Sequence, residues 1–114
     1  MDPRNPHRLN DLRSLAIHRL IAERIEADPG LLEGVRRRLG DLATRGVLHP
    51  RYAAAWAELL DGPLDRLLRT LRDDGERATA LRQASPFSGI IDQATRWRVW
   101  KDVTAAWRAD RGAA

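Results

Sequence analysis

Hydrophobic side chains recur along this chain at the three- and four-residue spacing of helices, and no segment alternates as a strand does. The clearest case is the stretch 29–45, where the apolar positions fall within an arc of about 120° on a helical projection. These positions are Leu31, Leu32, Val35, Leu39, Leu42 and Ala43. The pattern predicts an all-α protein.

Proline and glycine divide the chain into about five to six short helices, which we expect to form a compact bundle. Asp28 with Pro29 suits the start of the second helix, Gly46 its end, and Pro50 the first turn of the third. The predicted helices cover about 10–27, 29–45, 50–60, 64–71, 75–83 and 92–108. The predicted organisation is a flexible N-terminal arm, a single helical domain and a frayed C-terminus, at residues 1–9, 10–108 and 109–114.

Composition narrows the class of protein. The 114-residue chain is 43% hydrophobic and has no cysteine, which fits one globular domain and excludes disulfides and thiolate metal sites. Residues 1–8 lack the apolar core of a signal peptide, and no apolar run approaches the roughly 20 residues of a membrane span. We therefore expect a soluble, cytoplasmic protein. The net charge of +4 is a weak hint of an anionic partner, because a GC-rich genome alone also favours arginine over lysine.

The residue types that catalyse reactions or bind metals form no recognisable motif. The three histidines His7, His18 and His49 lack the spacing of a zinc site, and we expect His18 to be a partly exposed helix residue. Ser85 has no base near it in sequence, and no glycine-rich loop precedes a Lys-Ser or Lys-Thr pair. We therefore predict a non-enzymatic binding protein that needs no cofactor and no metal.

Three of the four tryptophans lie on one face of the last predicted helix, directly after the loop 85–89. In one interpretation Trp97 and Trp100 fill the core and Phe87 fastens the loop to it. In the other, this face is larger than a small bundle can bury and it binds a partner protein, since tryptophan and arginine are enriched at interface hot spots. The residues predicted to contact the partner are Arg82, Ser85, Pro86, Phe87, Ser88, Arg96, Trp97, Trp100 and Trp107.

The densest basic run is the candidate nucleic-acid site, and it comprises Arg36, Arg37 and Arg38. Three consecutive residues of a helix fan over roughly 200°, so they do not form one stripe along a groove. Glu33 and Asp41 lie within a turn and offset part of the charge. A DNA-binding regulator that uses this run or the basic N-terminal arm is the alternative function.

The segment 81–91, LRQASPFSGII, followed by Arg96 and Trp97, resembles a C-terminal signature LRQSSPFAGVL…ERW. An N-terminal pattern of the same proteins is matched by His18-Arg19, Ala22, Asp28-Pro29 and Leu31-Leu32. Together they resemble small bacterial antitoxin-like proteins encoded beside toxin genes, including nucleotidyltransferase-like toxins. The resemblance covers roughly residues 14–104, although the segment 92–95, DQAT, departs from the Ser/Thr-Pro-Glu-Glu helix start of those proteins.

The resemblance implies an antitoxin-like protein that masks the active site of a co-encoded toxin and performs no catalysis itself. The cognate toxin is then the expected partner. A homodimer and binding to the protein's own promoter DNA are left open, and no membrane partner is expected.

Overall fold

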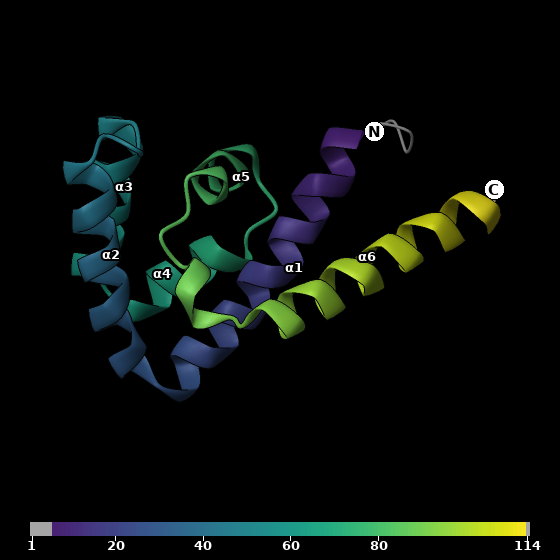
Figure 1. Cartoon of the computed structure of the whole chain (residues 1–114), viewed down its shortest axis with the longest axis horizontal. Helices are drawn as coiled ribbons and strands as arrows, with labels where there is room; N and C mark the ends of the chain where they lie inside the picture. Colours follow the sequence, from purple (N-terminus) through teal and green to yellow (C-terminus); the bar gives the residue numbers. More distant parts are fainter. Residues whose placement is uncertain (1–5, 114) are drawn as a thin grey trace.

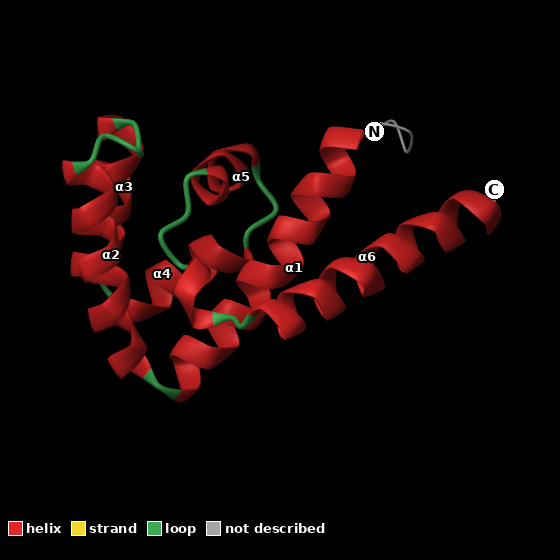
Figure 2. Ribbon diagram, viewed as in Figure 1, coloured by secondary structure: helices red, strands yellow, loops and turns green. Residues whose placement is uncertain are grey.

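The computed structural model describes residues 6–113, and within that range the chain forms six α-helices and no strand (Figure 1). The helices are α1 (Pro6–Ala27), α2 (Leu32–Thr44), α3 (Pro50–Asp61), α4 (Leu64–Arg72), α5 (Glu76–Gln83) and α6 (Gln93–Ala113). Short 3₁₀ turns, Pro29–Leu31 and Ser88–Ile90, precede α2 and α6. Figure 2 shows that only short loops separate these elements. The predicted all-α bundle of five to six helices is confirmed.

Both outer helices are longer than the sequence pattern predicted. α1 begins at Pro6, so the expected arm over residues 1–9 is wrong from residue 6 onward; residues 1–5 lie outside the described part. Proline is tolerated in a first helical turn, and Arg8 holds that turn by donating two hydrogen bonds to the carboxylate of Asp74, at 3.0 and 2.9 Å. α6 continues to Ala113, so the helix does not end near Arg108 as expected.

The predicted start and stop signals of α2 and α3 are in place. The side chain of Asp28 accepts a hydrogen bond from the backbone N–H of Gly30, at the turn that leads into α2. The ring of His49 accepts one from the N–H of Arg51 and so caps α3, with Pro50 in its first turn. Gly46 ends α2 with a φ of 69°, the left-handed conformation that glycine adopts without steric cost.

α1 is the helix around which the others are arranged, because it packs against α4, α5 and α6. α2 packs mainly against α3, and this pair lies at the opposite end of the molecule from the C-terminal half of α6 (Figure 1). The described chain measures 45 × 28 × 25 Å, with a radius of gyration of 14.8 Å. A compact domain of this length has a radius of about 13 Å, and the excess reflects the extension of α6 away from the core.

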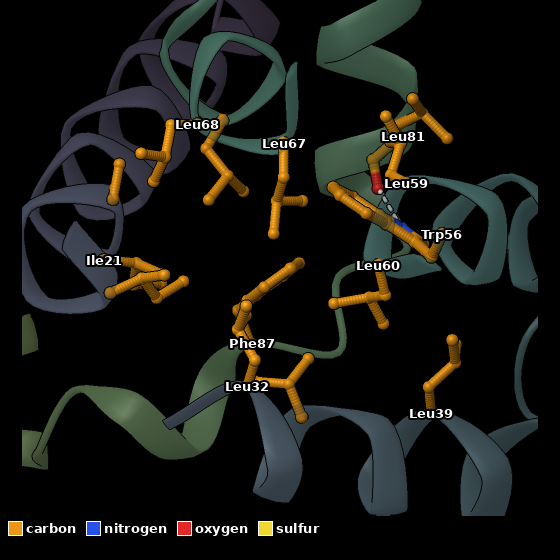
Figure 3. Packing of buried hydrophobic residues seen from close by; sticks show 14 of the residues in the cluster. Ile21, Leu32, Leu39, Trp56, Leu59, Leu60, Leu67, Leu68, Leu81 and Phe87 are labelled. Atoms are coloured by element: carbon orange, nitrogen blue, oxygen red, sulfur yellow. Dashed lines mark hydrogen bonds between the residues drawn. The ribbon is translucent and has the colours of Figure 1, made fainter. Parts of the chain in front are cut away.

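The core is built around Trp56 of α3 and Phe87 of the loop after α5, both completely buried. Their rings meet edge to face, with centroids 5.1 Å apart and planes inclined by 70°. The indole N–H of Trp56 donates to the carbonyl oxygens of Leu81 and Ala84, at 3.1 and 2.9 Å. Figure 3 shows Phe87 among the aliphatic side chains of the core, with the indole hydrogen bond drawn beside it. Phe87 thus fastens the loop to the core, as one of the two sequence interpretations expected.

Two glycine substitutions, one just after α2 and one inside it, test whether Gly46 caps the C-terminus of this helix. Gly46→Ala should lower the free energy of unfolding by about 1 kcal/mol, because alanine is strained at this positive φ although no atom lies within 4 Å of the added Cβ. Gly34→Ala, inside the same helix and equally uncrowded, should raise it by about 0.5 to 1 kcal/mol. Urea denaturation followed by circular dichroism measures both. Equal effects of the two substitutions would contradict the assigned cap.

Candidate partner-binding face and the adjoining cavity

The tryptophans of α6 are not part of the core. Trp97 is 56% exposed, and Trp100 and Trp107 are partly exposed. Trp97 and Trp100 stack on each other, with ring centroids 5.0 Å apart and planes inclined by only 17°. We call Trp97, Trp100 and Trp107 the tryptophan face. The interpretation in which Trp97 and Trp100 fill the core is therefore wrong, since Trp56 occupies that place.

α6 is attached to α1 through a polar junction. Between Gln93 and Asp110 the one buried side chain of α6 is Thr104. The guanidinium of Arg13, from α1, donates to the Thr104 hydroxyl through Nε and one terminal nitrogen, at 3.2 and 2.9 Å. The same guanidinium lies over the ring of Trp100, 3.7 Å from its centroid. A cation held against an aromatic ring attracts it electrostatically, so Arg13 fixes the orientation of the tryptophan face relative to α1.

The loop before α6 is packed inward, contrary to its predicted role in direct contact. Pro86 and Phe87 are completely buried, and Arg82 is only 3% exposed. These three residues were predicted to touch a partner, and in the folded chain their side chains offer it almost no accessible surface. Ser85 and Ser88 are partly buried. Arg96 is also partly buried, and it donates to the backbone carbonyl of Ser88 at 3.0 Å, which ties the start of α6 to the loop.

The predicted exposure of His18 is wrong. His18 is buried, not partly exposed, and its ring lies between α1 and the loop. Nε2 is 2.7 Å from the hydroxyl of Ser85, and Nδ1 is 2.7 Å from the backbone carbonyl of Ser14. A carbonyl can only accept, so Nδ1 carries the proton and Nε2 accepts from the serine hydroxyl. The ring edge also faces Phe87, with centroids 6.5 Å apart.

This serine–histidine pair has the connectivity of a nucleophile and its base, but its electrostatics oppose proton transfer. Burial lowers the pKa of His18 to about 4, and the positive charges of Arg82 and Arg96 act in the same direction. The partner of Nδ1 is a neutral carbonyl, so no carboxylate stabilises an imidazolium. A general base for neutral pH needs a pKa near 7. The arrangement favours an anchoring role, in which His18 holds the loop against α1.

A cavity of about 360 Å³ opens beside this pair, between α1, α5 and α6. Its charged lining consists of three arginines, one from each helix, and no carboxylate. The arginines are Arg13, Arg82 and Arg96. Trp100 forms part of the wall, so the cavity adjoins the tryptophan face. Periodicity could not predict this cavity, because its lining comes from residues 10–21 and 82–100, which lie far apart in the sequence.

The candidate nucleic-acid residues lie on α2, far along the chain from this region. Arg36, Arg37 and Arg38 are all exposed. The guanidinium of Arg36 donates to the backbone carbonyl of Leu60 at 2.6 Å, near the end of α3. A helix leaves its last carbonyls without intrahelical partners, so Arg36 serves to join α2 to α3. Arg37 and Arg38 are exposed and make no such bond to a backbone carbonyl of another helix among the described residues.

Among residues 6–113 no cluster of three or more histidine and carboxylate side chains could hold a metal ion. Within the same range no helix combines the length and apolar character needed to cross a membrane. Comparison of the chain with models of protein families, with curated proteins and with solved structures found no match.

The buried, neutral His18 makes stability depend on pH. The unfolded chain takes up a proton on this ring near pH 6.5, whereas the folded chain does so only near pH 4. The contribution of His18 to the free energy of unfolding is therefore fully present above about pH 6.5. It is lost as the pH is lowered toward 4, by at most about 3 kcal/mol. Denaturation curves at successive pH values should show this loss in the wild type. His18→Gln should show a flatter profile over the same window. An equal pH dependence in the two proteins would contradict the assignment.

Proposed function

We propose that the chain is an antitoxin-like binding protein that neutralises a co-encoded toxin by direct contact, with the tryptophan face of α6 as the main contact surface. One observation carries the proposal: Trp97 remains 56% exposed even though it stacks on Trp100. A preformed aromatic pair at the surface has already lost much of its side-chain freedom, so binding costs it little further entropy. Tryptophan is one of the residues most enriched at interface hot spots.

The way α6 is attached to the rest of the domain also supports its proposed role as the contact surface. A helix of 21 residues that buries only Thr104 among its described side chains leaves most of its length open to a second protein. Helices used in this way lie along a groove of the partner and present anchors at three- and four-residue spacing. Trp97, Trp100 and Trp107 are separated by three and seven residues, so they lie on one side of the helix and extend over about three turns.

Charge indicates the chemistry of the partner surface. Arg98, Lys101 and Arg108 are exposed on α6, where they outnumber the exposed carboxylates Asp102 and Asp110. The ammonium of Lys101 lies 5.8 Å from the centroid of Trp97. Exposed cations around an aromatic anchor favour an acidic surface on the partner and accelerate the encounter with it. The resemblance to proteins encoded beside toxins supports a toxin as this partner, bound so that its active site is covered.

The alternative, a DNA-binding regulator, gains no comparable support. Arg36 is committed to the carbonyl of Leu60, and Arg37 and Arg38 remain as two adjacent exposed cations. Phosphate contacts of specific DNA-binding domains are usually more numerous and are accompanied by side chains that read base edges.

The test is a binding measurement with the purified protein encoded by the adjacent gene. Trp97→Ala should weaken the complex by about thirtyfold or more, the loss expected for a hot spot of about 2 kcal/mol. Val47→Ala is the matched control, because Val47 is equally exposed, at 59%, but lies between α2 and α3. Isothermal titration calorimetry gives the affinities, and rescue of growth on co-expression reports neutralisation. Wild-type affinity and rescue by Trp97→Ala would overturn the proposal.

Phe87→Ala is unsuitable as a probe of the interface. Its ring is completely buried against Trp56, and removing a buried phenylalanine costs about 3 to 5 kcal/mol of stability. Any loss of toxin binding in that variant would report unfolding.

A further inference from the structure

The cavity between α1, α5 and α6 is unusual in the charge of its walls. Arg13, Arg82 and Arg96 supply three positive charges, whereas His18 is neutral at pH 7 and the other polar walls are uncharged serine, asparagine and glutamine side chains. Among residues 6–113, the ion pairs of the structure involve other arginines and leave these three without a carboxylate within 4 Å. Positive charge is thus concentrated on the cavity wall; the carboxylates of Asp11, Asp73 and Asp74 act on Arg82 from outside the lining and form no ion pair with it.

The three guanidiniums also retain unused hydrogen-bond donors. Each arginine has five N–H groups. Among residues 6–113, Arg13 makes three hydrogen bonds, to Thr104 and Asn10. Arg82 makes two, to the backbone carbonyl of Asp73 and the hydroxyl of Thr79, and Arg96 makes one. All of their acceptors are neutral oxygen atoms.

Arg82 shows the need for an anion most directly. Its side chain is only 3% exposed, and its Nε is a buried donor that has no hydrogen-bond partner among the described residues. Burial of a charged group costs several kcal/mol unless a counter-charge or a full set of hydrogen bonds compensates it. A donor left unpaired inside the fold normally marks a place where another group is expected.

From these observations we propose that the cavity binds the phosphoryl group of a phosphorylated small molecule, held by Arg13, Arg82 and Arg96. Guanidinium groups pair with phosphate oxygens through parallel hydrogen bonds, and the planar fork of arginine suits this geometry better than lysine does. Three positive charges that have no carboxylate in the cavity lining match the charge of about −2 on a phosphate monoester more closely than the single charge of a carboxylate. This inference does not depend on the proposed toxin partner.

The volume of the cavity leaves room for more than the phosphoryl group. About 360 Å³ lies within the range of small-molecule sites. Trp100 and Ile17 provide apolar wall beside the arginines, so the remainder of the ligand can contact an aromatic ring. The expected ligand therefore combines a phosphoryl group with an organic portion, and inorganic phosphate is the minimal probe of the site.

The experiment titrates inorganic phosphate into the full chain, in a phosphate-free buffer with ionic strength held constant by chloride. Two-dimensional NMR should show saturable shifts of the Trp100 indole N–H in the millimolar range. Arg96→Gln should weaken binding about tenfold, because it removes one charge-assisted contact. Arg98→Gln is the matched control, since Arg98 is exposed on the same helix and does not line the cavity; its affinity should stay within about twofold of the wild type.

Three results would overturn the proposal: no saturable response to phosphate, an equal response to acetate, or unchanged affinity in Arg96→Gln. An equal response to acetate would assign the cavity to carboxylates instead. Arg13→Gln serves as the second variant if Arg96→Gln fails to give a wild-type circular dichroism spectrum, and unchanged affinity in it would count in the same way. Because the titration uses the isolated chain, its outcome is independent of the toxin-binding test.

Discussion

The hydrogen bond from the Trp56 indole to the last carbonyls of α5 is the interaction on which the arrangement of the second half of the chain depends. A buried indole N–H needs an acceptor, and the end of a helix leaves carbonyls that need donors. Each requirement satisfies the other here, through Leu81 and Ala84. The end of α5 is thereby fixed against α3, and the chain that follows must carry Phe87 into the core and Ser85 against His18. α6 begins at Gln93, after the loop that carries Ser85 and Phe87.

The fold was predictable because its determinants are local. The apolar stripe of α2 and the breaks at Pro29, Gly46 and Pro50 depend on neighbours a few residues away, and each lies where the sequence placed it. The distribution of the tryptophans was not predictable in the same way. Trp56 and Trp100 both lie on apolar helical faces, and what distinguishes them is whether another helix covers that face. Such cover depends on contacts distant in sequence, which periodicity does not contain.

Several of the residues that carry the resemblance are internal. Pro86 and Phe87 are buried, Arg82 is nearly so, and His18 from the N-terminal pattern contacts Ser85 from the C-terminal one. A signature made of such residues describes how the loop is held against α1, so it reports a fold more directly than a binding surface. The sequence could have paired His18 with Ser85 only through this joint occurrence in one signature, because hydrogen bonds between positions 67 apart leave no local pattern.

Trp100 connects the arginine cavity with the tryptophan face. It lines the arginine cavity, it stacks on the exposed Trp97, and it lies under the guanidinium of Arg13. An anion that draws Arg13 toward the cavity changes the same cation–aromatic contact that orients the tryptophan face. A ligand in the cavity and a protein on α6 would then each alter the affinity of the other by the same factor, because coupling between two binding equilibria is reciprocal. The α1–α6 junction transmits such coupling directly, because Arg13 contacts both Thr104 and the ring of Trp100.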